Sequence, residues 1–239
     1  MGKPLITQRR GKGSPSFRAP SHHFYAVSRY RSIDSHDAGM LRGEVTEFID
    51  DPSRTTLLAR FVFEDGTESL VPAAEGLLTG DIIEEGTNAQ PSIGNIMPLS
   101  SIPEGYPIFN LEAHPGDGGS LVRSSGGIAY IVSKEANRVL VKLPSRELKY
   151  LDARCRATIG CAAGGGRVDK PMLKAGKGSF HALARGHWYP TVRGVHMNVV
   201  EHPFGGKQHH GAITPKGRGA PPGVHVGSFG ARRTGRRKR

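Results

Sequence analysis

Residues 57–71 read L-L-A-R-F-V-F-E-D-G-T-E-S-L-V, and this stretch carries the clearest fold signal in the chain. Two runs rich in apolar, β-branched and aromatic residues, 57–63 and 67–71, flank the dipeptide Asp65-Gly66. Asp-Gly between two such runs is typical of a β-hairpin, because Gly accepts the positive φ that a tight turn needs. The stretch therefore predicts two antiparallel strands joined by a short turn.

Further strand-like runs lie on both sides of this hairpin. Residues 43–49 and 80–83 supply two more short strands, and short strands at close spacing are typical of a small barrel. A second set of strand-like runs follows at 106–111, 127–133, 138–143, 147–151 and 154–159. Neither set contains a long run with the 3.6-residue period of a helix. We therefore predict an all-β protein with two small barrels, in residues 37–88 and 89–170.

The two ends of the chain lack this pattern. Residues 1–36 mix Arg, Lys, Gly, Ser and Pro without a sustained apolar period, and are predicted to form an extended arm. Residues 171–239 are predicted to form a second, Gly- and His-rich extension, since the stretch from 176 onward contains 13 Gly and seven of the eleven His. Gly lets a backbone approach phosphates closely, and aromatic or Arg planes can stack on bases.

The charge of the chain is distributed unevenly. The formal net charge is +12, but residues 40–115 carry three basic side chains against thirteen acidic ones. Residues 1–39 carry seven against two, residues 116–175 eleven against five, and residues 176–239 twelve against one. Arg outnumbers Lys by 22 to 11, and the planar Arg fork can hold a phosphate with two hydrogen bonds. The expected partner is a polyanion, and nucleic acid fits best.

Several protein classes are excluded by composition. The longest apolar run of the 239 residues is five, at 128–132, whereas a membrane span needs about 20. The N-terminus begins no apolar stretch, so we expect no secretory signal. Two Cys do not make a disulfide scaffold, and a reducing cytoplasm is the expected location.

Four features could carry chemistry, and each has a simpler interpretation. Cys155 and Cys161 lack the spacing of a zinc site, and alternation would point Cys155 into a core. The clustered His residues show no metal-binding motif, so no metal is expected. Residues 164–167 read G-G-G-R and could cradle a phosphate, but they lack the Lys of a nucleotide-binding loop. Glu201 and His202 could form an acid–base pair, as in a nuclease, but adjacent side chains seldom face one another.

One stretch is far more specific than these features. Residues 190–206 read P-T-V-R-G-V-H-M-N-V-V-E-H-P-F-G-G, which closely resembles the signature of the universal large-ribosomal-subunit protein two family. Further motifs match in family order: F-R-A-P-S-H at 17–22, A-A-E-G at 73–76, S-I-G-N at 92–95, I-P-E-G at 102–105, H-P-G-D-G-G at 114–119, V-K-L-P-S at 141–145, A-G-G-G-R-V-D-K-P at 163–171 and A-R-R-T-G-R at 231–236. The resemblance covers nearly the whole chain. The forms F-R-A-P-S-H and H-P-F-G-G resemble the archaeal and eukaryotic branch.

The resemblance implies more than composition does. The implied fold is an oligonucleotide-binding-type barrel followed by a Src-homology-like small barrel, with long extended N- and C-terminal arms. The implied function is structural: binding of large-subunit rRNA, with support of subunit association, tRNA binding and the architecture around the peptidyl transferase centre. The implied partners are rRNA, neighbouring large-subunit proteins and the small subunit through an intersubunit bridge. No membrane, small-molecule substrate or cofactor is implied, with Mg²⁺ and monovalent ions expected only as rRNA-bound counterions.

The resemblance also directs the choice of site residues. The side chains expected to bind rRNA are Arg9, Arg10, Lys12, Arg18, His22, His23, Arg29, Arg31, Arg123, Arg167, Lys174, Lys177, Arg193, His196, Asn198, His202, Lys207, His209, His210, Lys216, Arg218, Arg232, Arg233 and Arg236. No catalytic residue is expected, and His202, which matches a family His long debated as a participant in peptide-bond formation, is the sole candidate. Direct acid–base participation of His202, or an RNA-processing activity, remains the alternative. Two positions depart from the family pattern, Val199 where Pro is usual and Lys207 where Gly is usual.

Overall fold

The computed structural model describes residues 2–32 and 39–206. These residues divide into two compact units. One unit is Ser21–Leu173, and the other combines residues 2–20 with residues 174–206. We call them the barrel unit and the arm unit. The predicted four-part division of the chain stays a prediction, but residues 21–32, assigned to the N-terminal arm from sequence, here belong with the strands.

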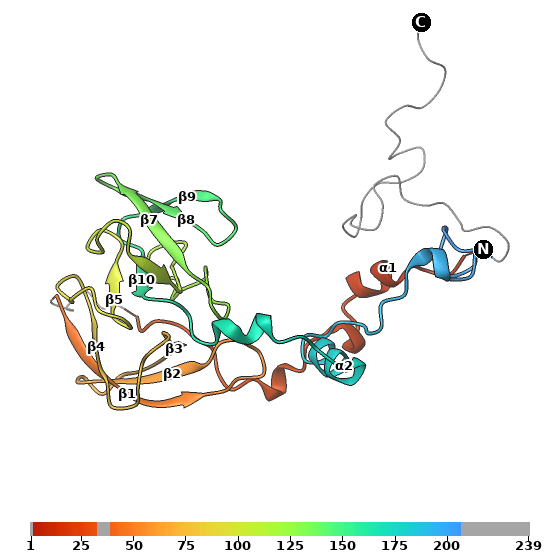
Figure 1. The fold of residues 1–239 in the computed structure, drawn as a ribbon, viewed down its shortest axis with the longest axis horizontal. Helices are drawn as coiled ribbons and strands as arrows, with labels where there is room; N and C mark the ends of the chain where they lie inside the picture. The colour runs from red at the N-terminus through yellow and green to blue at the C-terminus, as the bar shows by residue number, and fades with distance from the viewer. Residues whose placement is uncertain (1, 33–38, 207–239) are drawn as a thin grey trace, which may run out of the picture. The chain divides into compact units, whose positions relative to one another are not determined.

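The barrel unit is built on one continuous sheet of ten strands (Figure 1). The strands are β1 Leu41–Ile49, β2 Leu58–Phe63, β3 Glu68–Pro72, β4 Ile82–Glu85, β5 Ile96–Pro98, β6 Pro107–Phe109, β7 Ala129–Lys134, β8 Arg138–Lys142, β9 Leu148–Asp152 and β10 Arg156–Ile159. Their order in the sheet is β3-β2-β1-β4-β5-β10-β6-β7-β8-β9. Neighbours pair antiparallel except β4 and β5, which form a short parallel contact. The all-β fold class is confirmed.

The hairpin predicted from residues 57–71 is present as β2 and β3. Gly66 adopts φ 78°, the left-handed conformation that the turn requires. The amide of Phe63 donates to the carbonyl of Thr67 at 2.9 Å, and Val62 pairs with Glu68. The local turn chemistry thus sets the register of this edge of the sheet.

Two large hydrophobic cores and a small third cluster, formed by Ala74, Phe109 and Ala162, lie along the sheet. The first contains Tyr30, Val45, Ala59, Phe61, Phe63, Val71, Ala73, Ile83 and Ile96. The second is larger and contains Ala89, Met97, Leu99, Ile102, Ile108, Leu111, Ala129, Ile131, Val139, Val141, Leu151, Ala153, Cys155, Ala157 and Ile159. Cys155 is fully buried and free, as predicted. Alternation is not the reason, because Cys155 directly precedes β10 and all four residues of that strand are buried. Burial raises the pKa of its thiol to about 11, so it behaves as a small apolar side chain.

Tyr30 anchors the incoming chain in the barrel unit. Its side chain is 4% exposed, and its hydroxyl donates to the carbonyl of Asn110 at 2.7 Å and contacts the hydroxyl of Thr158 at 2.6 Å. The amide of Arg29 donates to the carbonyl of Leu70 at 3.0 Å. Local sequence did not predict this anchoring, because the partners of Tyr30 lie 80 and 128 residues away.

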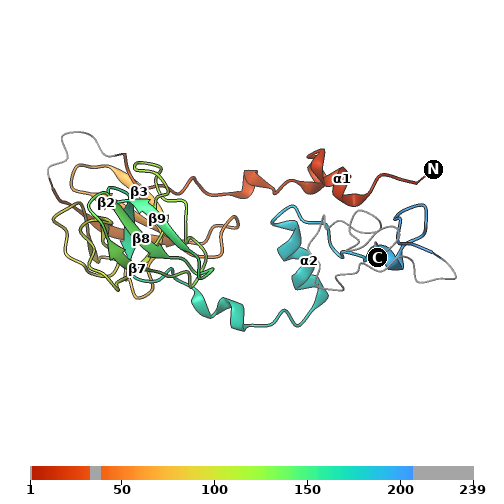
Figure 2. The same ribbon diagram turned by 90° about the horizontal axis from the view of Figure 1, so that it is seen from above.

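Short helical segments occur outside the strands, where sequence indicated only extended chain (Figure 2). They are α1 Ile6–Gly11, α2 Ala175–Leu183, and the 3₁₀ turns Pro15–Phe17, Ser21–His23, Gly165–Asp169 and Gly194–His196. No residue of these segments is buried, so none contributes to a core. Within residues 2–32 and 39–206, no helix is long and apolar enough to cross a membrane.

Candidate nucleic-acid interface

The arm unit joins the two ends of the described chain. The amide of Lys3 donates to the carbonyl of Val200 at 2.7 Å, and its ammonium lies 3.5 Å from the Glu201 carboxylate. The rings of Phe17 and Trp188 lie 5.9 Å apart. The first and last coloured segments accordingly run together in Figure 1. Two basic segments that the sequence presents as separate arms are thus brought together.

The arm unit is strongly cationic. Its described residues include nine Lys and Arg and a single acid, Glu201. Because Glu201 is already paired with Lys3, the remaining cations have no acidic partner among the described residues of this unit. Trp188 and Tyr189, in the same unit, are 44% and 45% exposed. Exposed cations together with exposed aromatic rings are what binding of phosphates and unpaired bases requires.

Most of the predicted rRNA ligands that the structure describes are exposed. These are Arg9, Arg10, Lys12, Arg18, His22, His23, Arg29, Arg167, Lys174, Lys177, Arg193, His196 and Asn198. Eight others lie outside the described residues: Lys207, His209, His210, Lys216, Arg218, Arg232, Arg233 and Arg236. The arm unit collects Arg9, Arg10, Lys12, Arg18, Lys174, Lys177, Arg193, His196 and Asn198, whereas His22, His23, Arg29 and Arg167 belong to the barrel unit. Arg185, which sequence analysis did not select, lies in the arm unit and hydrogen-bonds to His181.

Two predicted ligands, Arg31 and Arg123, instead contact protein. Arg31 is 11% exposed, and its guanidinium lies 3.4 Å from Glu85 and 3.7 Å from Asp65. Arg123 donates to the backbone carbonyls of Gly119 and Ser28, and burial lowers its pKa. Their guanidinium groups stabilise the fold, so a role in binding rRNA stays a prediction.

Arg156 forms a buried ionic cluster that sequence analysis missed. Its guanidinium contacts Glu85 at 2.7 Å and Glu112 at 2.8 Å, and all three side chains are at most 4% exposed. Burial lowers the pKa of Arg156, but the hydrogen bonds and charges of Glu112 and Glu85 outweigh that effect and raise it. Glu85 belongs to β4 and Arg156 to β10, so the cluster ties the two halves of the sheet together. A buried charge needs such partners, because an unpaired one would be strongly unfavourable.

The first half of the sheet does not suit phosphates. The three Arg of residues 40–115 are paired with carboxylates of the same segment: Arg42 with Glu84, Arg54 with Asp51, and Arg60 with Glu47. The remaining carboxylates would repel an RNA backbone. The candidate interface therefore lies on the basic parts of the chain.

His202 lies in a tightly folded loop of the arm unit. Its Nδ1 accepts a hydrogen bond from the amide of Phe204 at 3.1 Å, which places the ring proton on Nε2. The ring packs against the Phe204 ring at 4.9 Å, and a Cβ on Gly194 would overlap it. Glu201, its neighbour in sequence, faces Lys3. The ring is thus fixed as a hydrogen-bond donor at Nε2 rather than oriented as a general base.

Two further sequence features were considered as sites, the loop at residues 164–167 and a metal-binding cluster. Residues 164–167 begin a 3₁₀ turn in which Gly164 has φ 83°, and Arg167 donates to the hydroxyl of Ser125 at 3.1 Å. No group of three His, Cys, Asp or Glu side chains that could hold a metal occurs in residues 2–32 and 39–206.

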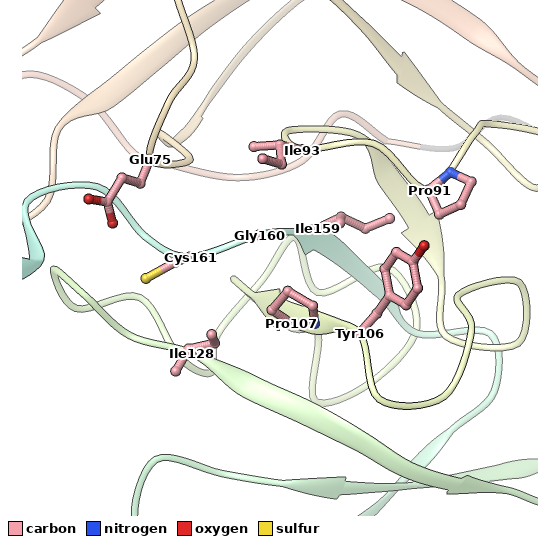
Figure 3. A pocket seen from close by; sticks show the side chains of 9 residues that line it. All are labelled: Glu75, Pro91, Ile93, Tyr106, Pro107, Ile128, Ile159, Gly160 and Cys161. Carbon is pink, nitrogen blue, oxygen red and sulfur yellow. The ribbon is translucent and has the colours of Figure 1, made fainter.

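A hollow of about 350 Å³ opens between the two halves of the sheet (Figure 3). It is lined by Glu75, Pro91, Ile93, Tyr106, Pro107, Ile128, Ile159, Gly160 and Cys161. Burial, together with the Glu75 carboxylate, raises the pKa of the Cys161 thiol, so the thiol is a poor nucleophile. Among these lining residues there is no His or Lys to serve as its base.

Comparison with known proteins gives a consistent picture. The family model described as "Ribosomal Proteins L2, RNA binding N-terminal domain" matches residues 2–85, and that of "Ribosomal Proteins L2, C-terminal domain" matches residues 92–224. A "Large ribosomal subunit protein uL2" of Methanothermobacter thermautotrophicus is 52% identical over 242 residues, which covers 100% of both chains. The chain belongs to the uL2 family. Proteins of the same name from Methanocaldococcus jannaschii and Haloarcula marismortui are 49% and 47% identical over 98% or more of each chain. The expected archaeal type of the uL2 family is therefore shown.

The uL2 family models relate directly to the fold. The N-terminal match ends at Glu85, the last residue of β4, and the C-terminal match begins at Ser92, shortly before β5. The break between them falls where the parallel contact joins β4 to β5. The motif at 190–206, which carried the resemblance, lies inside the C-terminal match and includes the His202 loop. Val199, one of the two departures from the uL2 pattern, is 67% exposed, and Lys207 lies outside the described residues.

Proposed function

We propose that this protein is a structural constituent of the large ribosomal subunit that binds rRNA. The observation that carries the proposal is the charge of the arm unit. Its described residues include nine Lys and Arg and one acid, Glu201, which is already paired with Lys3. Family membership supports the same function, since the N-terminal family model describes an RNA-binding domain and the relatives are named as large-subunit proteins. In this role the protein works in the cytoplasm, as part of the subunit.

We further propose the finer role that the family resemblance implies. The C-terminal extension organises rRNA near the peptidyl transferase centre, and the protein supports tRNA binding and subunit association through a bridge to the small subunit. Neighbouring large-subunit proteins are the other expected partners. No cofactor takes part, and Mg²⁺ acts only as a counterion of the rRNA. The loop at residues 194–206 supports this proposal, because His196, Asn198 and Gly206 are exposed and can lie against RNA.

The protein is not an enzyme in this proposal. The uL2 family is a family of ribosomal constituents, and the geometry of His202 favours a hydrogen-bond donor over a proton acceptor. Peptide-bond formation is therefore supported by positioning of RNA rather than by side-chain chemistry.

The proposal predicts rRNA binding that depends steeply on salt. The arms and the second barrel carry 30 Lys and Arg. If about ten of them meet phosphates, log K should fall against log salt with a slope of about −7 to −9. Titration of large-subunit rRNA with the purified chain at increasing KCl measures this slope.

Two charge variants test which cations contribute to the salt dependence of binding. Replacing Arg9 and Arg10 by Gln should make the slope shallower by about 1.5, because two phosphate contacts are lost. Arg42→Gln removes another exposed cation, from the acidic half of the sheet, and should leave the slope unchanged. A wild-type slope shallower than about −3 would contradict the electrostatic basis of the proposal.

A further inference from the structure

The outer surface of strands β7–β9 exposes four large side chains. Tyr130 and Val132 of β7 are 43% and 45% exposed, and Leu148 and Tyr150 of β9 are 55% and 53% exposed. Ile131, between the two exposed residues of β7, is 1% exposed and belongs to the second core. Alternation along the strand therefore directs the exposed side chains away from the core and into solvent.

The register makes these side chains neighbours on one surface. Tyr130 pairs with Lys142, and Lys142 pairs with Leu148, which gives one row across the three strands. Leu140 pairs with Tyr150 in the adjacent row. We call this surface the β7–β9 face, and it comprises Tyr130, Val132, Leu140, Lys142, Leu148 and Tyr150.

Two cations lie on or next to this face. Arg138 and Lys142, at the two ends of β8, are exposed and lie on the same side of the strand as Leu140. Asp152 pairs with Arg138 in the register, but its carboxylate accepts two hydrogen bonds from Arg154, at 3.1 and 3.0 Å. The face thus offers cations whose charge complements that of a phosphate backbone.

The two tyrosines are too far apart to hold stacked neighbours. Tyr130 and Tyr150 are two strands apart and offset by two residues, which puts them about 12 Å apart. Consecutive stacked bases are separated by only about 3.4 Å. Within the described parts of the chain, neither tyrosine ring is paired with another aromatic ring. Both are therefore available to ligands that arrive separately.

We propose that the β7–β9 face binds a single-stranded segment of RNA in which two bases are splayed apart. One base stacks on Tyr130 and the other on Tyr150, while the connecting phosphates lie near Lys142 and Arg138. Bases of a duplex cannot do this, because their faces are covered by neighbours in the helix. This inference rests on the proposed rRNA-binding function. It adds a second binding site, separate from the arms and the basic loops, and no residue of the β7–β9 face is among the predicted rRNA ligands.

The test compares single-stranded and duplex RNA binding to the full chain. Fluorescence anisotropy with labelled oligouridylate of about 12 nucleotides, within the range of single-strand binding sites, measures the first affinity. A duplex of the same length measures the second. Replacing Tyr130 and Tyr150 by Ala should weaken single-strand binding by at least about fivefold, because stacking is lost. Duplex binding should not change. Replacing both by Phe should keep single-strand binding, since the rings remain.

Matched controls separate this site from folding and from the arms. Tyr25 is 50% exposed and hydrogen-bonds to Arg60 on the acidic half of the sheet, so Tyr25→Ala should change neither affinity. The proposal is overturned if the double Ala variant binds oligouridylate with normal affinity, or if its affinity for the single strand and for the duplex falls equally. It is also overturned if the double Phe variant loses as much affinity for oligouridylate as the double Ala variant. None of these outcomes affects the salt-dependent binding of rRNA by the wild-type chain, which tests the proposed function separately.

Discussion

The most informative single residue is His202. Its Nδ1 is occupied by the amide of Phe204, so the ring can donate from Nε2 but is not placed to accept a proton there. Sequence alone left a catalytic and a structural interpretation open, because it showed the motif but neither the ring's partner nor its tautomer. The structure supports the interpretation in which His202 shapes the loop from Pro203 to Gly206. A hydrogen bond from His202 to RNA stays a prediction.

Substitution of His202 distinguishes these interpretations. His202→Gln keeps a hydrogen-bond donor but cannot exchange a proton near neutral pH. Subunits with His202→Gln should assemble and form peptide bonds near the normal rate, whereas His202→Ala should mainly impair assembly or association. Single-turnover peptidyl transfer by fully assembled subunits measures the chemical step. A loss of 100-fold or more with His202→Gln, the size of a general acid–base contribution of about 10²–10⁴, would require a catalytic role.

A second residue-scale prediction concerns Gly194. Its φ is not in the left-handed region, so the position demands Gly for space alone, since a Cβ there would overlap the His202 ring. Gly194→Ala should therefore displace the ring and reproduce the assembly defect of His202→Ala. Gly166→Ala is the matched control, because a Cβ at Gly166 meets nothing within 4 Å. Incorporation of each variant into subunits, measured by sedimentation, tests the pair. Equal incorporation of Gly194→Ala and Gly166→Ala would show that the packing around His202 is not required.

At the scale of elements, local signals in the sequence predicted the strands well. The dipeptide Asp65-Gly66 is enough to specify the turn, so β2 and β3 were predicted within one or two residues of their bounds. β5 was missed because it has only three residues and ends in Pro98. The cluster around Arg156 could not be predicted, because its partners Glu85 and Glu112 lie 71 and 44 residues away. Long-range pairing leaves no periodic pattern in the sequence.

The motif at 114–119 shows that a family signature can be structural. The Asp117 carboxylate accepts hydrogen bonds from the amides of Ala113, His114 and Gly119 at 2.9, 3.2 and 3.0 Å. The carbonyl of Gly118 in turn accepts from the amide of Tyr30 at 3.0 Å. The loop thereby fixes the segment that enters the first core.

This loop predicts a pH dependence of stability. Burial raises the pKa of Asp117, but its hydrogen bonds with Ala113, Gly119, His114 and Ser120 outweigh that effect and lower it. Since the folded pKa lies below the unfolded value of about 3.9, the contribution to stability is present above about pH 4 and is lost as pH falls through the folded pKa. Asp117→Asn should destabilise by about 1–3 kcal/mol at neutral pH.

Chemical denaturation at a series of pH values from 7 down into the acidic range checks this expectation. The difference in unfolding free energy between wild type and Asp117→Asn should shrink on acidification. Asp169→Asn removes an exposed carboxylate from a 3₁₀ turn and should shift stability little at any pH. A difference that stays constant from neutral to acidic pH would show that the Asp117 charge is not what stabilises the loop.

At the scale of the whole molecule, the two units differ in the interactions that stabilise each of them internally. The barrel unit has two cores and a continuous sheet, whereas α1 and α2 of the arm unit contain no buried residue. Burial of apolar surface is the main term that offsets the conformational entropy lost on folding. The arm unit also concentrates like charges, which repel one another unless an anion is present. Its order should therefore depend on RNA far more than that of the barrel unit.

Amide hydrogen exchange on the free chain tests this dependence. Amides of the central strands β1, β2, β7 and β8 should be protected without RNA, because opening them exposes the cores. Amides of α2, Ala175–Leu183, should exchange rapidly in the free chain and slow down when rRNA is added, as phosphates neutralise the cations around the helix. The strands serve as the internal control, since their protection should change little on binding. If α2 is protected as strongly as β7 in the free chain, the arm unit folds without its partner, and RNA binds a surface that is already formed.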